Sequence, residues 1–474
     1  MKKKICAGCH KENCDGCRLW GEGKINNGKE KAQVLPPTVT TEVRSGFGIA
    51  FDIGTTTVAA SLWDLRSGTW MGTESCVNPQ RIYGGDIISR VTYAMEHEDG
   101  LDKMSYMIKE TMEELAVRLE ENAAVYLSEE TNSVCPEAIT KVVAVGNTVM
   151  CQILAGISLE GLSKAPFMEG YGGVIRKNGS EMGFKRLKNA EIVILPPVGG
   201  YVGADALSVY TYVATTDKRK NILIVDVGTN GEMILIGEKE VYACSAAAGP
   251  ALEGAAISRG MVAAPGAVCR VRVAGNFPVE DIYCDVIGGG DAKGICGSGL
   301  LDTLALLRKL EVVDADGYLR SAKEASASGG KERICRRVEE GEERQFLLTG
   351  EENPVYLTAS DIRQLQLSKG AIRAGIEVLL KKAGVSAGEI TCLYLAGAFG
   401  NHICPASALA IGLLPEMDEE KIIGVGNGAG LGASMALCSE EVIEWAEKAA
   451  GQIRHVELAG EEDFQEKFMA CLAF

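Results

Sequence analysis

The sequence predicts an α/β protein built from two related lobes. One pattern occurs twice: an apolar strand ends in Asp-x-Gly-Thr, and a second apolar strand follows at once. The two copies are Asp52-Ile53-Gly54-Thr55 and Asp226-Val227-Gly228-Thr229. A chain of 474 residues is also too long for one compact core. Its 57 glycines and only 6% aromatic residues favour many tight strand-to-helix turns over an all-β sandwich.

Composition and charge exclude several classes of function. With 46% hydrophobic and 24% charged residues, the chain has the composition of a folded protein. Its net charge of −16 argues against binding to nucleic acid or to an anionic membrane surface. No apolar run approaches the roughly 20 residues of a spanning helix. The basic start, Met1–Lys4, leads into a polar Cys-rich stretch rather than an apolar one, so we expect no secretory signal and a cytoplasmic protein.

The chain divides into four parts. We expect a four-Cys module at 1–20, a linker at 21–45, a first lobe at 46–206 and a second lobe at 207–474. A polar stretch at 316–350 is interpreted as a surface insertion or long loop. Hydrophobic periodicity predicts the elements within the lobes. The expected hairpins lie at 47–63 and 221–236, and the further strands at 141–145, 192–195, 391–395 and 422–425. The expected helices lie at 99–130 and 359–383, with another starting at 149–154 and a last one that opens within 426–430 and runs to 437.

The two Asp-x-Gly-Thr turns have the chemistry of phosphate loops. Glycine lets the backbone approach a phosphate, to which exposed amides and Thr hydroxyls donate hydrogen bonds. The Asp supplies a hard oxygen that Mg²⁺ prefers, usually through water. One copy would be weak, but two copies in matching hairpins favour a nucleotide cleft. The alternative, two plain turns with Asp as turn former, does not explain why the strand before each Asp is apolar almost throughout.

Further segments follow in a recognisable order. They are Asn78-Pro79-Gln80-Arg81 to Arg90, Ala246 to Ala255, Gly294 to Asp302, Leu393 to His402, and Gly426 to Gly430. With these, residues 46–440 resemble the superfamily of actin, sugar and acetate kinases and heat-shock chaperones (ASKHA). Within it, they resemble the reductive activators of corrinoid proteins. The resemblance implies a two-lobed, actin-like ATPase made of duplicated ribonuclease-H-like domains.

The resemblance also implies a function, cofactors and partners. Members of this family use ATP and Mg²⁺ to return the Co(II) of a corrinoid protein to Co(I), which accepts methyl groups in the methyltransferase systems of anaerobes. It implies dimerisation as well. Asp302, Asn401 and His402 are interpreted as structural. By the same resemblance, Asp52 and Asp226 would hold Mg²⁺ and orient water, Gly54, Thr55, Thr56, Gly228 and Thr229 would line the phosphates, and Gly397, Ala398 and Gly400 would pack on the adenosine.

Four cysteines near the start form a candidate metal centre. Cys6, Cys9, Cys14 and Cys17 follow the spacing C-x2-C-x4-C-x2-C, which differs from the ferredoxin spacing. The family pattern places a [2Fe–2S] ferredoxin domain before the ATPase, and we expect no room for one here. Four thiolates fit a [4Fe–4S] cluster or Zn²⁺, with free thiols as a third reading, and the redox family favours iron–sulfur. The electron would come from this centre, or from a ferredoxin or other low-potential donor.

Two other functions fit the same fold. One is a small-molecule kinase in which the Cys module is a structural zinc knuckle. A kinase needs a carboxylate base beside the substrate hydroxyl, and the sequence announces none. The other is a regulatory ATP-binding protein that docks a separate ferredoxin through residues 1–20. Fold alone does not separate these functions.

Overall fold

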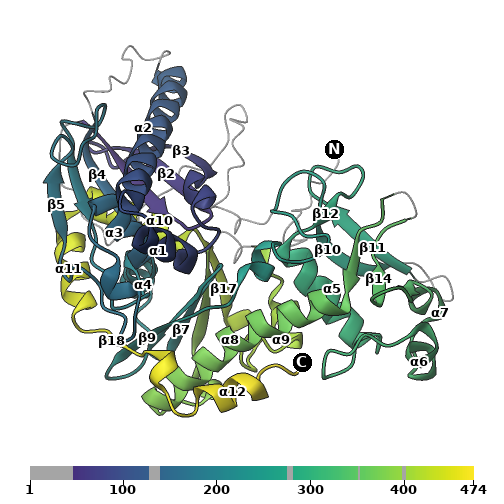
Figure 1. Cartoon of the computed structure of the whole chain (residues 1–474). Coiled ribbons are helices and arrows are strands. Elements are labelled where there is room, and N and C mark those ends of the chain that lie inside the picture. Colours follow the sequence, from purple (N-terminus) through teal and green to yellow (C-terminus); the bar gives the residue numbers. More distant parts are fainter. Residues whose placement is uncertain (1–45, 128–138, 275–280, 351–352, 398–401) are drawn as a thin grey trace. The chain divides into compact units, whose positions relative to one another are not determined.

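The computed structural model describes residues 46–127, 139–274, 281–350, 353–397 and 402–474 (Figure 1). Contacts divide the chain into two units. The first contains the chain up to Arg219 together with Gly426–His455, and the second contains Lys220–Val425 and Val456–Phe474. Each unit is built on its own mixed β-sheet. The predicted α/β fold with two related parts is confirmed.

The sheet of the first unit has the strand order β3-β2-β1-β4-β6-β5. β1, β2 and β3 form an antiparallel meander, and β4 joins the other side of β1 in parallel. β1 and β4 are buried along most of their length, as expected for parallel pairs in the middle of a sheet. The strands are β1 (Phe47–Ile53), β2 (Thr57–Asp64), β3 (Thr69–Val77), β4 (Ile139–Gly146), β5 (Ile175–Asn178) and β6 (Glu191–Ile194).

A late segment of the chain completes the first unit. α10 packs on β1, β4 and α4, and the side chain of Trp63 donates a hydrogen bond to Ser434 Oγ at 3.1 Å. We expected the lobes to meet at 206/207, with all later residues in the second lobe. The structure differs, because α4 and α10 bury their apolar residues against each other. The helices here are α1 (Ile87–Glu96), α2 (Gly100–Leu127), α3 (Thr148–Ala155), α4 (Ala204–Thr216), α10 (Gly428–Cys438) and α11 (Glu440–Ala450), with short turns at Pro79–Ile82 and Glu160–Leu162.

The main sheet of the second unit repeats this arrangement. β7, β8 and β9 form an antiparallel meander, and β16 joins the other side of β7 in parallel, followed by β17. This is the order of β1, β2, β3, β4 and β6, so the duplicated hairpins begin duplicated sheets. The strands are β7 (Ile222–Val227), β8 (Gly231–Ile236), β9 (Val241–Ala246), β16 (Cys392–Ala396) and β17 (Ile422–Gly426), and β18 (Arg454–His455) lies where the chain passes back to the second unit.

Helices and two small sheets make up the rest of the second unit. α8 packs on β8 and β9, and α5 packs on β10. The helices are α5 (Gly297–Lys309), α8 (Ala359–Ala383), α9 (Pro405–Ala410) and α12 (Phe464–Ala470), with short turns η4 (Pro250–Glu253), Ala387–Glu389, Glu419–Lys421 and Leu458–Gly460. The small sheets contain β10 (Ala267–Ala274), β11 (Asp281–Val286) and β12 (Gly294–Ile295), and β13 (Val338–Glu339), β14 (Gln345–Leu347) and β15 (Tyr356–Thr358).

The polar stretch at 316–350 is folded. It contains α6 (Ala322–Ala327), α7 (Glu332–Cys335), β13 and β14, and buries Ile334 and Phe346 in the core of the second unit. Of the two readings, surface insertion or long loop, the long loop is wrong, because a few well-spaced apolar residues anchor an otherwise polar segment. Among the described residues, each helix is too short or too polar to cross a bilayer.

Candidate nucleotide site

The first phosphate loop lies at the end of β1, where the sequence predicted it. Asp52 is the second-last residue of β1, and Gly54, Thr55 and Thr56 connect it to β2. A Cβ at Gly54 would lie 2.6 Å from the carbonyl oxygen of Thr57, so only glycine fits this turn. The structure thus brings the four predicted residues of this loop together in one turn.

Two carboxyl groups and an amide meet near the first loop. Burial, and then the charge of Asp205, raise the pKa of Asp52 to about 7, while a hydrogen bond with Asn427 opposes the shift. Burial also raises the pKa of Asp205 to about 6, against the hydrogen bond from the Ala206 amide. A divalent cation beside these carboxyl groups would favour their ionised forms and so lower both pKa values.

The first turns of two helices are built against the end of β4. A Cβ at Gly203, which precedes α4, would lie 2.5 Å from the carbonyl oxygen of Gly146 at the end of β4. Asn147 caps α3 by accepting from the Val149 amide at 3.0 Å, and its Nδ2 donates to Tyr201 O at 2.9 Å. This packing fixes the start of α4, and so fixes the position of its second residue, Asp205.

The second phosphate loop follows β7 in the second unit. Asp226 lies opposite Glu232 of β8, and the Gly228 amide donates to Asn230 O at 3.1 Å. The Thr229 amide donates to Glu253 Oε1 at 3.0 Å, so the last residue of η4 is tied to this loop. The predicted residues Asp226, Gly228 and Thr229 thus share one turn with a carboxylate that the sequence analysis left without a role.

Gly397, the residue directly after β16, packs against the second Asp-x-Gly-Thr loop. Gly397 has φ +90°, and a Cβ there would lie 2.5 Å from Asp226 Oδ1. Only glycine combines this backbone conformation with this approach. Ala398, Gly400 and Asn401 lie outside the described residues, while His402 is exposed.

Asp302 lies in a buried contact within the second unit. Its Oδ1 accepts a hydrogen bond from Ser407 Oγ at 2.6 Å, and Arg270 Nε lies 3.5 Å from its Oδ2. Burial raises the pKa of Asp302, which Ser407 and Arg270 oppose. These contacts join α5 to α9, so they favour the structural role that we expected.

The predicted metal-binding cysteines, Cys6, Cys9, Cys14 and Cys17, lie outside the described residues. Across 46–127, 139–274, 281–350, 353–397 and 402–474, no group of three or more His, Cys, Asp or Glu side chains could hold a metal. Among the described cysteines, Cys244 and Cys296 are buried, whereas Cys76 and Cys269 are partly exposed.

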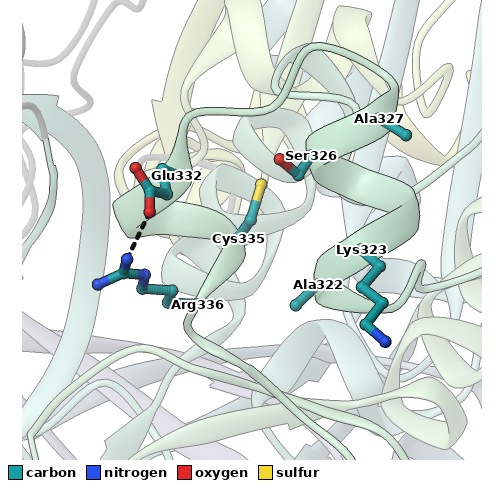
Figure 2. Close-up of a pocket in the computed structure, with 7 residues that line it drawn as sticks. All are labelled: Ala322, Lys323, Ser326, Ala327, Glu332, Cys335 and Arg336. Carbon is teal, nitrogen blue, oxygen red and sulfur yellow. Dashed lines mark hydrogen bonds and ion pairs between the residues drawn. The ribbon is translucent and has the colours of Figure 1, made fainter.

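A pocket of about 480 Å³ lies between α6 and α7 in the second unit (Figure 2). Lys323 and Arg336 border it, Arg336 pairs with Glu332, and the sulfur of Cys335 points between the helices. None of the predicted site residues lines it. We therefore do not assign the nucleotide to this pocket.

Sequence comparison decides the family. Residues 47–218 match the RACo middle region, and residues 220–474 match the C-terminal domain of RACo, the ASKHA domain. The chain belongs to the RACo family. The junction between the two matches falls at the Arg219/Lys220 division of the structure. The family expected from the phosphate loops and the segments between them is confirmed.

Relatives of known name extend this RACo assignment. The corrinoid activation enzyme RamQ of Eubacterium limosum is 33% identical over 433 residues, covering 90% of this chain and 70% of RamQ. A reductase of a Co(II) methylated amine-specific corrinoid protein from Methanosarcina barkeri is 26% identical over 466 residues, covering 90% of this chain and 77% of the reductase. A solved reductive activator for a corrinoid, iron–sulfur protein is 31% identical with a TM-score of 0.77, covering 92% of this chain and 67% of that one.

Proposed function

We propose that the protein is an ATP-dependent reductive activator of a corrinoid protein of a methyltransferase system. It would return one cobalt from Co(II) to Co(I) by passing on one electron from a low-potential donor. The observation that carries this proposal is RACo-family membership across both units, with a relative named as a corrinoid activation enzyme at 33% identity. A location in the cytoplasm and a homodimer belong to the same proposal.

We propose that these loops bind ATP and Mg²⁺. Gly54 and Gly397 occupy turns so tight that a Cβ would collide with Thr57 O and Asp226 Oδ1, which supports loops built around these two positions. Asp52 and Asp226 would hold Mg²⁺ through water, and Asp205 adds a carboxylate near Asp52. The remaining residues of the proposed site are Thr55, Thr56, Gly228 and Thr229 at the phosphates and Ala398 and Gly400 at the adenosine.

The role of ATP in this proposal is conformational. Binding and hydrolysis of ATP supply free energy that favours one arrangement of the protein over another. The chain's own part is to orient the phosphates with the loop amides and hydroxyls, and to place carboxylates where the cation is held. We propose that this change makes an otherwise uphill reduction of Co(II) possible.

Single substitutions of the two Asp residues test the nucleotide site. Asp52→Ala and Asp226→Ala should each lower ATP hydrolysis by ~100-fold or more, because each removes a carboxylate that positions the cation and water. Glu332→Ala, which removes an exposed carboxylate of α7, should leave hydrolysis unchanged. If hydrolysis survives both Asp substitutions, the assignment of the loops is wrong.

We further propose that Cys6, Cys9, Cys14 and Cys17 hold a [4Fe–4S] cluster, with Zn²⁺ as the alternative. The spacing admits both, and the redox function of the relatives favours iron. Iron, sulfide and zinc assays on anaerobically purified protein, with visible spectra before and after dithionite, separate the two. Zinc without iron would contradict an internal electron donor and assign the electron to a ferredoxin or another external donor.

A further inference from the structure

Two buried residues hold three consecutive carbonyl oxygens of the first phosphate loop. Asn78 donates from Nδ2 to Gly54 O at 2.9 Å and from its backbone amide to Thr56 O at 2.8 Å. Arg90 donates from Nη2 to Thr55 O at 2.6 Å. Both side chains are 0% exposed. With its carbonyls held in this way, the loop has its peptide planes fixed before any ligand arrives.

The remaining hydrogen bonds of Arg90 also go to uncharged groups. Its Nε donates to Gly84 O at 3.1 Å, and its Nη1 lies 3.3 Å from Gln80 Oε1 and 3.0 Å from the sulfur of Met150. Burial lowers the pKa of Arg90 to about 10, so the guanidinium stays charged at neutral pH. Within the part of the chain that the structure describes, none of its hydrogen-bond partners is a carboxylate.

The nearby carboxylate, Asp86, accepts hydrogen bonds from Ser89 and acts on Arg90 through its charge. Asp86 caps α1: its Oδ1 accepts from the Ser89 amide at 2.9 Å and its Oδ2 from Ser89 Oγ at 2.7 Å. A Cβ at Gly84 would lie 2.8 Å from the Arg90 amide, so glycine is needed for this close turn. The turn at Gly84 and the helix cap made by Asp86 and Ser89 therefore place the buried positive charge of Arg90 behind the loop.

A buried charge is costly to a folded protein. The negative charge of Asp86 offsets only part of this cost for Arg90, because burial still lowers the pKa of the guanidinium more than Asp86 raises it. The cost falls when an anion binds nearby, because the attraction is weakly screened in a buried setting. Catalytic sites use such fixed charges to hold phosphoryl groups. The first phosphate loop is the structure that Arg90 directly supports, so an anion on this loop would gain from its charge.

We propose that Arg90 is a positioning residue that favours the polyphosphate of a nucleotide at the first loop, through its buried charge and its bond to Thr55. This inference rests on the proposed nucleotide site. It assigns a role to a residue that does not itself contact the ligand. It also gives a function to the segment from Asn78 to Arg90. This segment is part of the family resemblance, but the resemblance assigned no role to it.

Calorimetric titration of the full-length protein with Mg²⁺-ATP and with adenosine tests the inference. Arg90→Met should bind ATP about 10- to 100-fold more weakly, because both the charge and the loop contact are lost. Arg90→Lys keeps the charge but not the forked hydrogen bonds, and should fall between Arg90→Met and the wild type. Adenosine affinity should stay within about 2-fold in both variants, because adenosine carries no phosphate.

Lys141→Met is the matched control. Lys141 is also buried in the first unit and is paired with Glu440 at 3.2 Å. It lies opposite Gly48, at the far end of β1 from the loop. This variant should lose stability but bind ATP like the wild type.

The outcomes separate the two proposals. A folded Arg90→Met protein that binds ATP with wild-type affinity overturns the inference, and so does an equal loss for ATP and adenosine. If Arg90→Met does not fold, Arg90→Lys decides: selective loss of ATP affinity supports the positioning role, and unchanged affinity overturns it. A wild-type protein that does not bind ATP at all contradicts the proposed function instead.

Discussion

The side chains near the first phosphate loop work against folding in the absence of a ligand. Burial and the neighbouring Asp205 raise the pKa of Asp52 from 3.8 to about 7. The folded protein therefore binds more protons than the unfolded chain between these two values. By linkage, this group lowers the free energy of unfolding progressively as pH rises from about 4 to about 7. Because these carboxylates lower stability, we infer that they serve another purpose, and binding a cation would be such a purpose.

Asp52→Asn should therefore stabilise the nucleotide-free protein at pH 8. The gain in stability follows from removing a buried negative charge. Each kcal/mol of added stability raises the unfolding temperature by about 2–4 °C. It should shrink as pH is lowered from 8 to 5, because wild-type Asp52 becomes protonated. The same variant should lose the stabilisation that Mg²⁺-ATP gives the wild type. Thermal unfolding at both pH values, with and without Mg²⁺-ATP, measures this, and a lower unfolding temperature at pH 8 would contradict it.

Gly397 offers a second test at the residue scale. Gly397→Ala places a methyl group 2.5 Å from Asp226 Oδ1 on a backbone with φ +90°. We expect a stability loss of about 1–3 kcal/mol from strain, and ATP hydrolysis reduced by ~10-fold or more because Asp226 is displaced. Gly388→Ala in the same unit, where a Cβ meets no atom within 4 Å, should change neither. Equal hydrolysis in the two variants would remove Gly397 from the site.

Among the secondary-structure elements, the sequence predicted best those with long regular patterns. The helix expected at 359–383 is α8 (Ala359–Ala383), and the one expected at 99–130 is α2 (Gly100–Leu127). Both hairpins were predicted because apolar strands flank each Asp-x-Gly-Thr turn. The return of α10 to the first unit was not predicted, because it depends on packing between segments far apart in the chain.

The same limit applies to the supporting residues of the site. Asp205 opens a helix after a glycine, a signal that the sequence does contain. However, its closeness to Asp52 follows only from the way α4 packs on the end of β4. Asn78 and Arg90 lie in a segment that carries the family resemblance. Their hydrogen bonds to a loop more than twenty residues earlier can be seen only in the folded structure.

The packing of α10 on α4 can be tested with one glycine. A Cβ at Gly432 would lie 2.1 Å from Ser208 O, so Gly432→Ala should push the helices apart and destabilise the first unit by about 1–3 kcal/mol. Trp63, Trp70 and Trp445 all belong to the first unit, so the unfolding transition seen by tryptophan fluorescence should shift. Gly460→Ala, at an open position in the second unit, is the control. An unshifted transition would contradict the assignment of α10 to the first unit.

Considered as a whole molecule, the chain repeats one design. Each unit has an antiparallel meander whose first turn carries the Asp-x-Gly-Thr sequence, and a parallel strand beside the first strand of that meander. We propose that a nucleotide bound at these loops favours one of two conformations of the protein. In the RACo family, we propose that this bias drives an electron onto cobalt.

The most direct test combines the protein, a low-potential electron donor and a corrinoid protein in the Co(II) state under anaerobic conditions. The visible spectrum of the corrinoid reports the formation of Co(I), and phosphate release reports ATP turnover. We predict that Co(I) forms with Mg²⁺-ATP but not with Mg²⁺-ADP, and that the corrinoid protein stimulates ATP turnover. Asp52→Ala and Asp226→Ala should abolish both effects. The account would be contradicted if Co(I) does not form and a sugar or carboxylic acid, rather than the corrinoid protein, stimulates turnover.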